Sequence, residues 1–93
     1  MTKATISAWR KIDGQDVVQS LQAAAEKLAN GDSDVVLDFT SVERIDTSAL
    51  REMETLAARA DEHSVKVGLR GVNIDVYKVL KLMKLSPRFS FLS

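Results

Sequence analysis

The sequence predicts an α/β fold, with a largely parallel β-sheet and helices that pack mainly on one of its faces. Short β-branched apolar segments alternate along the chain with longer segments whose apolar residues recur at helical spacing. That order favours β-α-β units, in which right-handed crossovers connect parallel strands. The remaining positions of the helical segments are polar, so we expect each helix to bury one face only.

The first strand and helix are predicted within residues 4–30. Ala4–Trp9 alternates loosely and contains Thr, Ile and Trp, which suits a strand. We expect Asp13 to cap the following helix, with Asp16 adding a second acid near its positive end. Asn30-Gly31 is a usual helix end, because both residues tolerate left-handed backbone. The apolar stripe of this helix consists of Val17, Leu21, Ala24, Ala25 and Leu28.

A short polar loop separates the next strand and helix. Asp34 to Phe39 is β-branched and apolar at consecutive positions, as expected of a central strand. From about Thr47 the helical period returns, with polar residues between the apolar ones. The apolar stripe consists of Ala49, Leu50, Met53, Leu56, Ala57 and Ala60.

The last third of the chain predicts a strand, a helix and a short final strand. Residues 65–69 alternate between apolar positions and polar or small ones, which indicates a half-buried strand. We expect Pro87 to prevent the third helix from continuing, and residues 89–92 to form an edge strand. The third helical stripe consists of Val76, Val79, Leu80 and Met83.

Composition narrows the class of protein. A chain of 93 residues allows one domain with a modest core, and we expect residues 1–93 to form it. Thirteen basic residues balance thirteen acidic ones, so no overall field attracts nucleic acid or an anionic membrane. The absence of cysteine excludes disulfides and thiolate metal sites. With no apolar run near the roughly 20 residues that span a bilayer and no secretory signal pattern, we expect a cytoplasmic protein without membrane insertion.

No catalytic, metal or cofactor motif is recognisable. His63, the one histidine, follows Asp61 and Glu62 at a predicted helix end, which we interpret as a solvated terminus. A metal site needs three or four converging ligands. The four glycines are too dispersed for a phosphate-binding loop, and no serine lies in a G-x-S-x-G elbow. We therefore expect no enzyme, no metal and no cofactor.

A basic ridge lies on the third predicted helix, where Lys78, Lys81 and Lys84 follow one another at three-residue spacing and Arg88 lies beyond. Such a ridge fits an acidic partner or a phosphate. It is also typical of a solvated helix face that offsets the negative end of the dipole, and we favour that interpretation. Nucleic-acid binding is not expected, because aromatic residues are few and do not interleave with these charges.

The strongest functional signal is Asp46-Thr47-Ser48 at the predicted strand-to-helix turn. All three residue types are preferred N-caps, so capping alone explains any one of them. Three in a row are more than one cap needs, and a helix N-terminus stabilises a phosphate. A phosphate would add roughly −1.5 to −2 charges beside Asp46 and Glu43, which would repel or block a partner. From the residues alone both interpretations stay open, with capping the simpler one.

The segments Val35–Phe39 and Ser41–Leu50 resemble the signature of STAS domains, the sulfate-transporter and anti-sigma-factor-antagonist family. The pattern is an apolar strand with an acid near its end, a short loop, and then Ile-Asp-Thr-Ser-Ala-Leu. The resemblance continues through residues 67–72 and 76–85 to Phe89, and covers about residues 12–92. It implies a mixed, largely parallel sheet of about four strands with helices mainly on one face, and a regulatory role instead of catalysis.

In the antagonist branch of this family, the residue after the motif aspartate is phosphorylated by a serine kinase that doubles as the anti-sigma factor, an ATPase of the histidine-kinase-like type. That position is Thr47 here, and Ser48 is the second candidate. The resemblance implies that the unphosphorylated protein binds the kinase and frees the sigma factor, and that a phosphatase resets the switch. The expected partner-binding residues are Arg44, Asp46, Thr47, Ser48 and Arg51.

Departures from the antagonist pattern keep a second function open. Ala49 stands where glycine is frequent, Arg51 stands where a small residue is frequent, and the usual two-strand opening is reduced to Ala4–Trp9. A stand-alone STAS subunit also occurs in bacterial phospholipid-transport ABC complexes, with a similar Asp-Thr pair and a Gly-Val-Asn-x-x-Val-Tyr segment. Gly71–Tyr77 resembles that segment. The alternative is therefore an accessory subunit that binds the transporter ATPase through the same helix.

Overall fold

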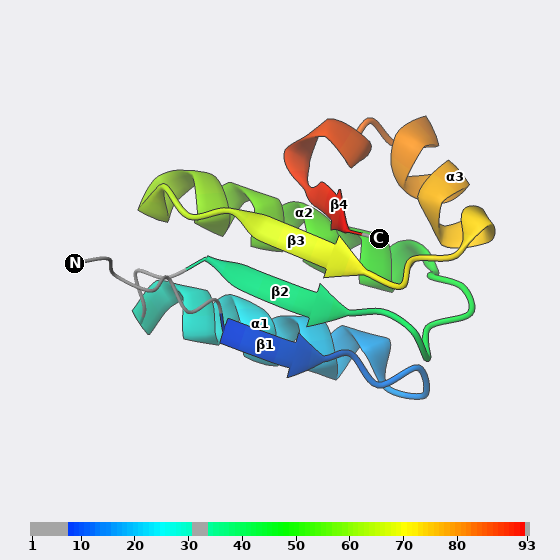
Figure 1. The fold of residues 1–93 in the computed structure, drawn as a ribbon, viewed down its shortest axis with the longest axis horizontal. Helices are drawn as coiled ribbons and strands as arrows, with labels where there is room; N and C mark the ends of the chain where they lie inside the picture. Colours follow the sequence, from blue (N-terminus) through cyan, green and yellow to red (C-terminus); the bar gives the residue numbers. More distant parts are fainter. Residues whose placement is uncertain (1–7, 31–33, 93) are drawn as a thin grey trace.

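The computed structural model describes residues 8–30 and 34–92, and in them strands and helices alternate along the chain (Figure 1). The elements are β1 (Ala8–Lys11), α1 (Val17–Asn30), β2 (Val35–Asp38), α2 (Thr47–His63), β3 (Val67–Arg70), α3 (Ile74–Leu82), the 3₁₀ helix η1 (Ser86–Arg88) and β4 (Ser90–Leu92).

The strands lie side by side in the order β1-β2-β3-β4, and every neighbouring pair is parallel. The predicted α/β fold with a four-stranded sheet is confirmed, as are the central place of β2 and the edge place of β4. The resemblance implied a mixed sheet, but the strands of the described residues all run in one direction. A helical crossover joins each strand to the next, and such a connection returns the chain in the same direction.

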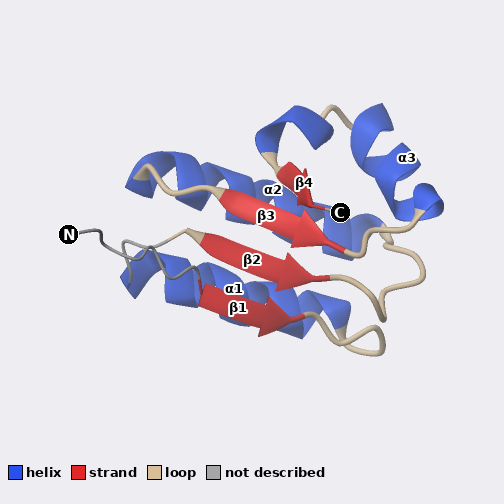
Figure 2. Cartoon of the chain, viewed as in Figure 1, coloured by secondary structure: helices blue, strands red, loops and turns tan. Residues whose placement is uncertain are grey.

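One face of the sheet carries the helical layer. Figure 2 shows α1 and α2 next to each other behind the sheet, while α3 lies beyond its β4 edge. Strand register places Leu37 beside Leu69 in one row, and both side chains are fully buried. On the opposite face Trp9 is 53% exposed, with the Arg70 guanidinium 5.3 Å from its ring centre. The prediction that helices cover mainly one face is confirmed.

Small side chains are buried on both α1 and α2, which lie next to each other. Alanines are buried on both helices, for example Ala24 and Ala25 on α1 and Ala57 and Ala60 on α2. Small residues at a helix contact allow the two axes to approach closely. The predicted stripe of α2 is confirmed apart from Leu50, which is only half buried.

The start of the chain differs from the prediction in two ways. The strand runs from Ala8 to Lys11, two residues past the predicted end, and residues 4–7 lie outside the described residues. Asp13 does not cap α1, which begins four residues later at Val17. Its carboxylate instead accepts a hydrogen bond of 2.9 Å from the backbone N–H of Gln15. That bond reaches two residues on, the pattern by which aspartate stabilises a turn. Asn30 ends α1 as predicted, and Gly31 lies outside the described residues.

The end of α3 was also predicted wrongly. The helix stops at Leu82, well before Pro87, and Met83 is 46% exposed instead of lying in the buried stripe. Lys84 adopts left-handed backbone with φ of 62°. The N–H of Leu85 then donates to the carbonyl of Leu80 at 2.8 Å, a bond that closes a helix C-terminus. Because Leu85 is buried, its packing ends the helix and Pro87 only starts η1.

Candidate functional site

Asp46 caps the N-terminus of α2. Its backbone is extended, and its carboxylate accepts a hydrogen bond of 2.8 Å from the N–H of Ala49. Its own carbonyl accepts the first helical bond, from Leu50 at 2.9 Å. Ala49 is 1% exposed, so this cap sets the direction in which α2 enters the core. Capping typically contributes about 1 kcal/mol to stability.

Thr47 and Ser48 are the first two residues of α2, and both are exposed. Across the part of the chain that the structure describes, neither hydroxyl forms a hydrogen bond. Asp46 therefore supplies the cap, and the two hydroxyls remain available at the positive end of the helix. Backbone N–H groups in the first turn favour an anion at this place.

The loop before α2 is anchored by two buried side chains. Val42 is 2% exposed and Ile45 is 9% exposed, while Glu43 and Arg44 between them face solvent. The N–H of Val42 donates to the carbonyl of Phe39 at 2.9 Å, which closes a turn directly after β2. The loop is therefore pinned at its start and end, and its middle is exposed.

Asn73, which directly precedes α3, holds this loop through hydrogen bonds, and it was not among the predicted site residues. Its side-chain amide donates to the carbonyls of Val42 at 3.3 Å and Glu43 at 3.0 Å. Its side-chain oxygen accepts from the N–H of Val76 at 2.8 Å and so caps α3. One side chain thus joins the start of α3 to the loop that leads to Thr47. The sequence holds two signals for it, an asparagine directly before a helical stripe and its place in the Gly71–Tyr77 segment.

A second loop, between β1 and α1, lies against the first. The N–H of Gly14 donates to the Ser41 hydroxyl at 3.2 Å, and that hydroxyl donates to the Ile12 carbonyl at 3.0 Å. A Cβ at position 14 would lie 1.9 Å from the Ser41 carbonyl oxygen, so this approach requires glycine. Nothing local in the sequence indicates this contact, because Gly14 and Ser41 are 27 residues apart.

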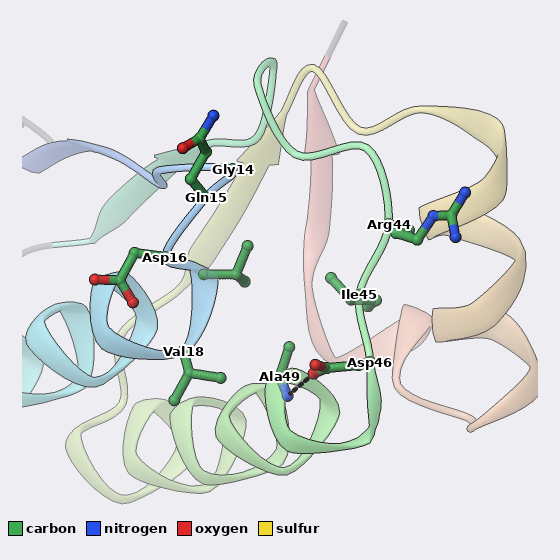
Figure 3. Close-up of a pocket in the computed structure, with 9 residues that line it drawn as sticks. Gly14, Gln15, Asp16, Val18, Arg44, Ile45, Asp46 and Ala49 are labelled. Atoms are coloured by element: carbon green, nitrogen blue, oxygen red, sulfur yellow. Dashed lines mark hydrogen bonds between the residues drawn. The ribbon is translucent and has the colours of Figure 1, made fainter.

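A cavity of about 340 Å³ opens between the N-termini of α1 and α2. Figure 3 shows Asp16 and Val18 on its α1 side and Ile45, Asp46 and Ala49 on its α2 side. Arg44 borders the cavity, but its side chain points away from Asp16 and Gln15 (Figure 3). The complete lining consists of Gly14, Gln15, Asp16, Val17, Val18, Arg44, Ile45, Asp46 and Ala49.

The predicted site residues do not all lie together. Asp46, Thr47 and Ser48 share the first turn of α2, and Arg51 follows Thr47 by four residues on the same face of the helix. Arg44 lies on the loop before them. Within the described residues, Arg44 and Arg51 form no ion pair, and both are exposed. Their positive charges are therefore available to a partner.

Asp38 ends β2 and starts the loop. Hydrogen bonds from the Thr40 hydroxyl at 2.7 Å and the Thr40 N–H at 3.0 Å hold its pKa below the ordinary value. Partial burial opposes this shift, and nearby Lys11 and Arg70 add to it. In the strand register Asp38 lies between Lys11 of β1 and Arg70 of β3. The carboxylate therefore remains charged and organises the first turn of the loop.

His63 ends α2 and is exposed, as expected of a solvated helix end. Among residues 8–30 and 34–92, no three or more histidine, aspartate or glutamate side chains gather where they could hold a metal ion. The helices in the same ranges are all too short or too polar to cross a membrane.

Comparison with known proteins assigns the chain to a family. Residues 11–87 match the family model described as "Mlab, STAS domain". No curated protein matches the chain. The fold is similar to the crystal structure of a protein from Thermotoga maritima that is proposed to be an anti-sigma factor antagonist, with a TM-score of 0.71 and 18% sequence identity. The match covers 90% of this chain and 74% of that one. At that identity the likeness concerns the fold.

Proposed function

Because the chain belongs to the STAS domain family, we propose that it is a protein-binding regulator of the anti-sigma factor antagonist type, switched by phosphorylation of Thr47. The observation that carries the proposal is the separation of roles at the start of α2. Asp46 caps the helix, and the exposed Thr47 hydroxyl has no structural bond among the described residues. A kinase can therefore modify Thr47 without removing the cap.

The proposed partner surface is the exposed part of the loop and the first turns of α2. Thr47 and Ser48 lie at its centre, and Arg44 and Arg51 flank them with unpaired positive charge. The unphosphorylated surface binds a serine kinase of the histidine-kinase-like ATPase type, which is also the anti-sigma factor. In this proposal the chain is cytoplasmic, performs no catalysis and needs no cofactor.

Phosphorylation would reverse the local charge. A phosphate carries roughly −1.5 to −2 charges at neutral pH and would stand beside Glu43 and Asp46. Arg51 lies one turn away and can pair with that phosphate, which removes Arg51 from the partner. Both effects weaken the complex, while the helix dipole keeps the phosphorylated turn folded.

Phosphorylation is tested by incubating the chain with its kinase and ATP and locating the phosphate by mass spectrometry. We expect one phosphate, which Thr47→Ala loses and the matched variant Ser48→Ala keeps. A phosphate on another residue, with Thr47 unmodified, would contradict the assignment.

A charge-mimicking variant separates the switch from capping. Thr47→Glu is expected to weaken binding of the kinase with little change in the melting temperature, because Asp46 still caps α2. Asp46→Ala is the matched control for the cap and should lose about 1 kcal/mol of stability. If Thr47→Glu destabilises the fold as much as Asp46→Ala, Thr47 is structural and the switch is rejected.

The second candidate is an accessory subunit of a phospholipid-transport ABC complex that binds its ATPase through α2. Two observations favour it: the matching family model carries the name Mlab, and the Gly71–Tyr77 segment supplies the Asn73 cap and loop contacts. Capture of a transporter ATPase from the native host, with no phosphate on Thr47, would select this function. Capture of a kinase-type ATPase together with a sigma factor would select the first function.

A further inference from the structure

Exposed apolar side chains are concentrated on α3 and β4. Of the six large apolar residues that are exposed within the described residues, four lie on α3 or β4, Met83 directly follows α3, and Trp9 lies elsewhere. Ile74 is 69% exposed and Leu82 is 80% exposed, at opposite ends of α3. The others are Tyr77, Met83 and Leu92. Such a concentration on a small domain marks an interaction surface more often than a solvated one.

A groove opens within this surface, between the start of α3 and β4. Its volume is about 210 Å³, and its apolar walls include Ile74, Phe91 and Leu92. The Tyr77 and Phe91 rings pack edge to face, with their centres 5.0 Å apart, and this contact holds both rings in place in the groove. Ligand pockets usually measure about 300–1,000 Å³. The groove is therefore too small for a typical cofactor but suits one or two apolar side chains of a partner.

Basic residues share this surface. Lys78 and Lys81 follow Ile74 by four and seven residues, so all three lie on one stripe of α3. Lys84 continues the positive charge beyond the helix. In the described part of the chain these lysines form no ion pair, whereas Arg88 is paired with Asp61 at 2.6 Å. Two of the three unpaired lysines share a stripe of α3 with the exposed Ile74, whereas a merely solvated ridge would carry no apolar side chain.

We propose that this α3–β4 face, defined by Ile74, Tyr77, Lys78, Lys81, Leu82 and Leu92, binds an amphipathic helix of a protein partner. The helix inserts apolar anchors spaced three and four residues apart and carries Asp or Glu beside them. Charge complementarity selects the acidic flanks, because Asp75 is the one acid on α3. The recessed groove favours a protein over a lipid surface, since a groove receives side chains whereas a membrane receives protruding ones.

The face is distinct from the proposed switch on α2, so the two can be tested separately. The probe is a synthetic helical peptide with leucine at positions i, i+3, i+4 and i+7 and glutamate on both flanks. It is titrated into ¹⁵N-labelled protein of full length, and amide shifts are followed by NMR. We expect the largest shifts at Ile74–Leu82 and Ser90–Leu92.

Variants distinguish binding through the lysines, binding through the apolar groove and non-specific binding. The double variant Lys78→Glu and Lys81→Glu is expected to weaken peptide binding at least tenfold, and Ile74→Ser to do the same. Lys27→Glu, a single lysine-to-glutamate change on α1, should bind as the unaltered chain does. All of these side chains are exposed, so the amide spectrum of each variant should remain that of the folded protein.

Three outcomes overturn the proposal. The first is the absence of shifts on the α3–β4 face at about 1 mM peptide, and the second is shifts that Lys27→Glu removes as well. The third is binding to phosphatidylglycerol vesicles that depends on Lys78 and Lys81 while the peptide does not bind, which would assign the face to an anionic membrane. A control peptide with lysine in place of glutamate should not bind the α3–β4 face.

Discussion

Asn73 is expected to stabilise the protein through two separable contacts. Asn73→Ala removes the cap of α3, which costs about 1 kcal/mol. It also removes the amide that donates to the Val42 and Glu43 carbonyls. Each such bond is worth about 0.5–1.5 kcal/mol net, and solvent access together with the length of the first bond places both at the lower end. The expected total is about 2 kcal/mol.

Asn73→Asp is the matched variant that isolates the loop contact. Its carboxylate can still accept from the N–H of Val76, so the cap of α3 is kept. A charged carboxylate cannot donate, and it faces two carbonyl oxygens. The helix dipole compensates part of this cost. We expect a loss of about 1 kcal/mol, which lies between the unaltered chain and Asn73→Ala.

Urea and thermal unfolding followed by circular dichroism measure these differences. For a domain of this size, 1 kcal/mol corresponds to roughly 4–8 °C in melting temperature. Hydrogen exchange at the amides of residues 42–46 reports the loop directly, and both variants should accelerate it. If Asn73→Asp is as stable as the unaltered chain and its loop amides exchange at an unchanged rate, the hydrogen bonds from Asn73 to the loop contribute nothing to stability. If Asn73→Ala loses less than about 0.5 kcal/mol, the reasoning on both contacts fails.

Two further predictions concern Thr40 and its neighbours. Gly71→Ala should lose about 2 kcal/mol or more in urea unfolding, because Gly71 has φ of +75° and an added Cβ would lie 2.3 Å from the Thr40 methyl carbon. Gly68→Ala, whose Cβ would meet only the flexible end of a leucine at 3.1 Å, should lose less. The Thr40 bonds lower the pKa of Asp38 in the folded state, so their contribution is present above about pH 4 and is lost as the pH falls through the folded pKa. Thr40→Val should therefore be less stable at neutral pH, with a difference that shrinks on acidification; a difference that stays constant with pH would refute the assignment to Asp38.

Local patterns predicted much of this molecule correctly. The order of strands and helices follows from apolar periodicity, since an amphipathic segment of each kind must bury its apolar face. The start of α2 at about Thr47 was predicted from the return of the helical period, and Asp46, one of three cap-type residues there, bonds the N–H of Ala49. These features depend on residues within a few positions of one another, so they can be read along the chain.

The errors arose where a distant contact overrode a local signal. Pro87 was predicted to end α3, but the burial of Leu85 ends it earlier and leaves Met83 in solvent. Asp13 was predicted to cap α1, yet the approach of Gly14 to Ser41 keeps that segment as a turn. In both cases packing against another part of the chain decided the backbone.

The sequence by itself determined the α/β class, the presence of cap-type residues at the start of α2 and the family resemblance that singled out Thr47, because each depends on residue types at short spacing. Only the tertiary structure decided that Asn73 supports the loop before Thr47 from 30 residues away. It likewise decided that apolar side chains of α3 and β4 line one groove. Both are consequences of how the crossover after β3 returns along the sheet, and no local pattern records the path of a crossover.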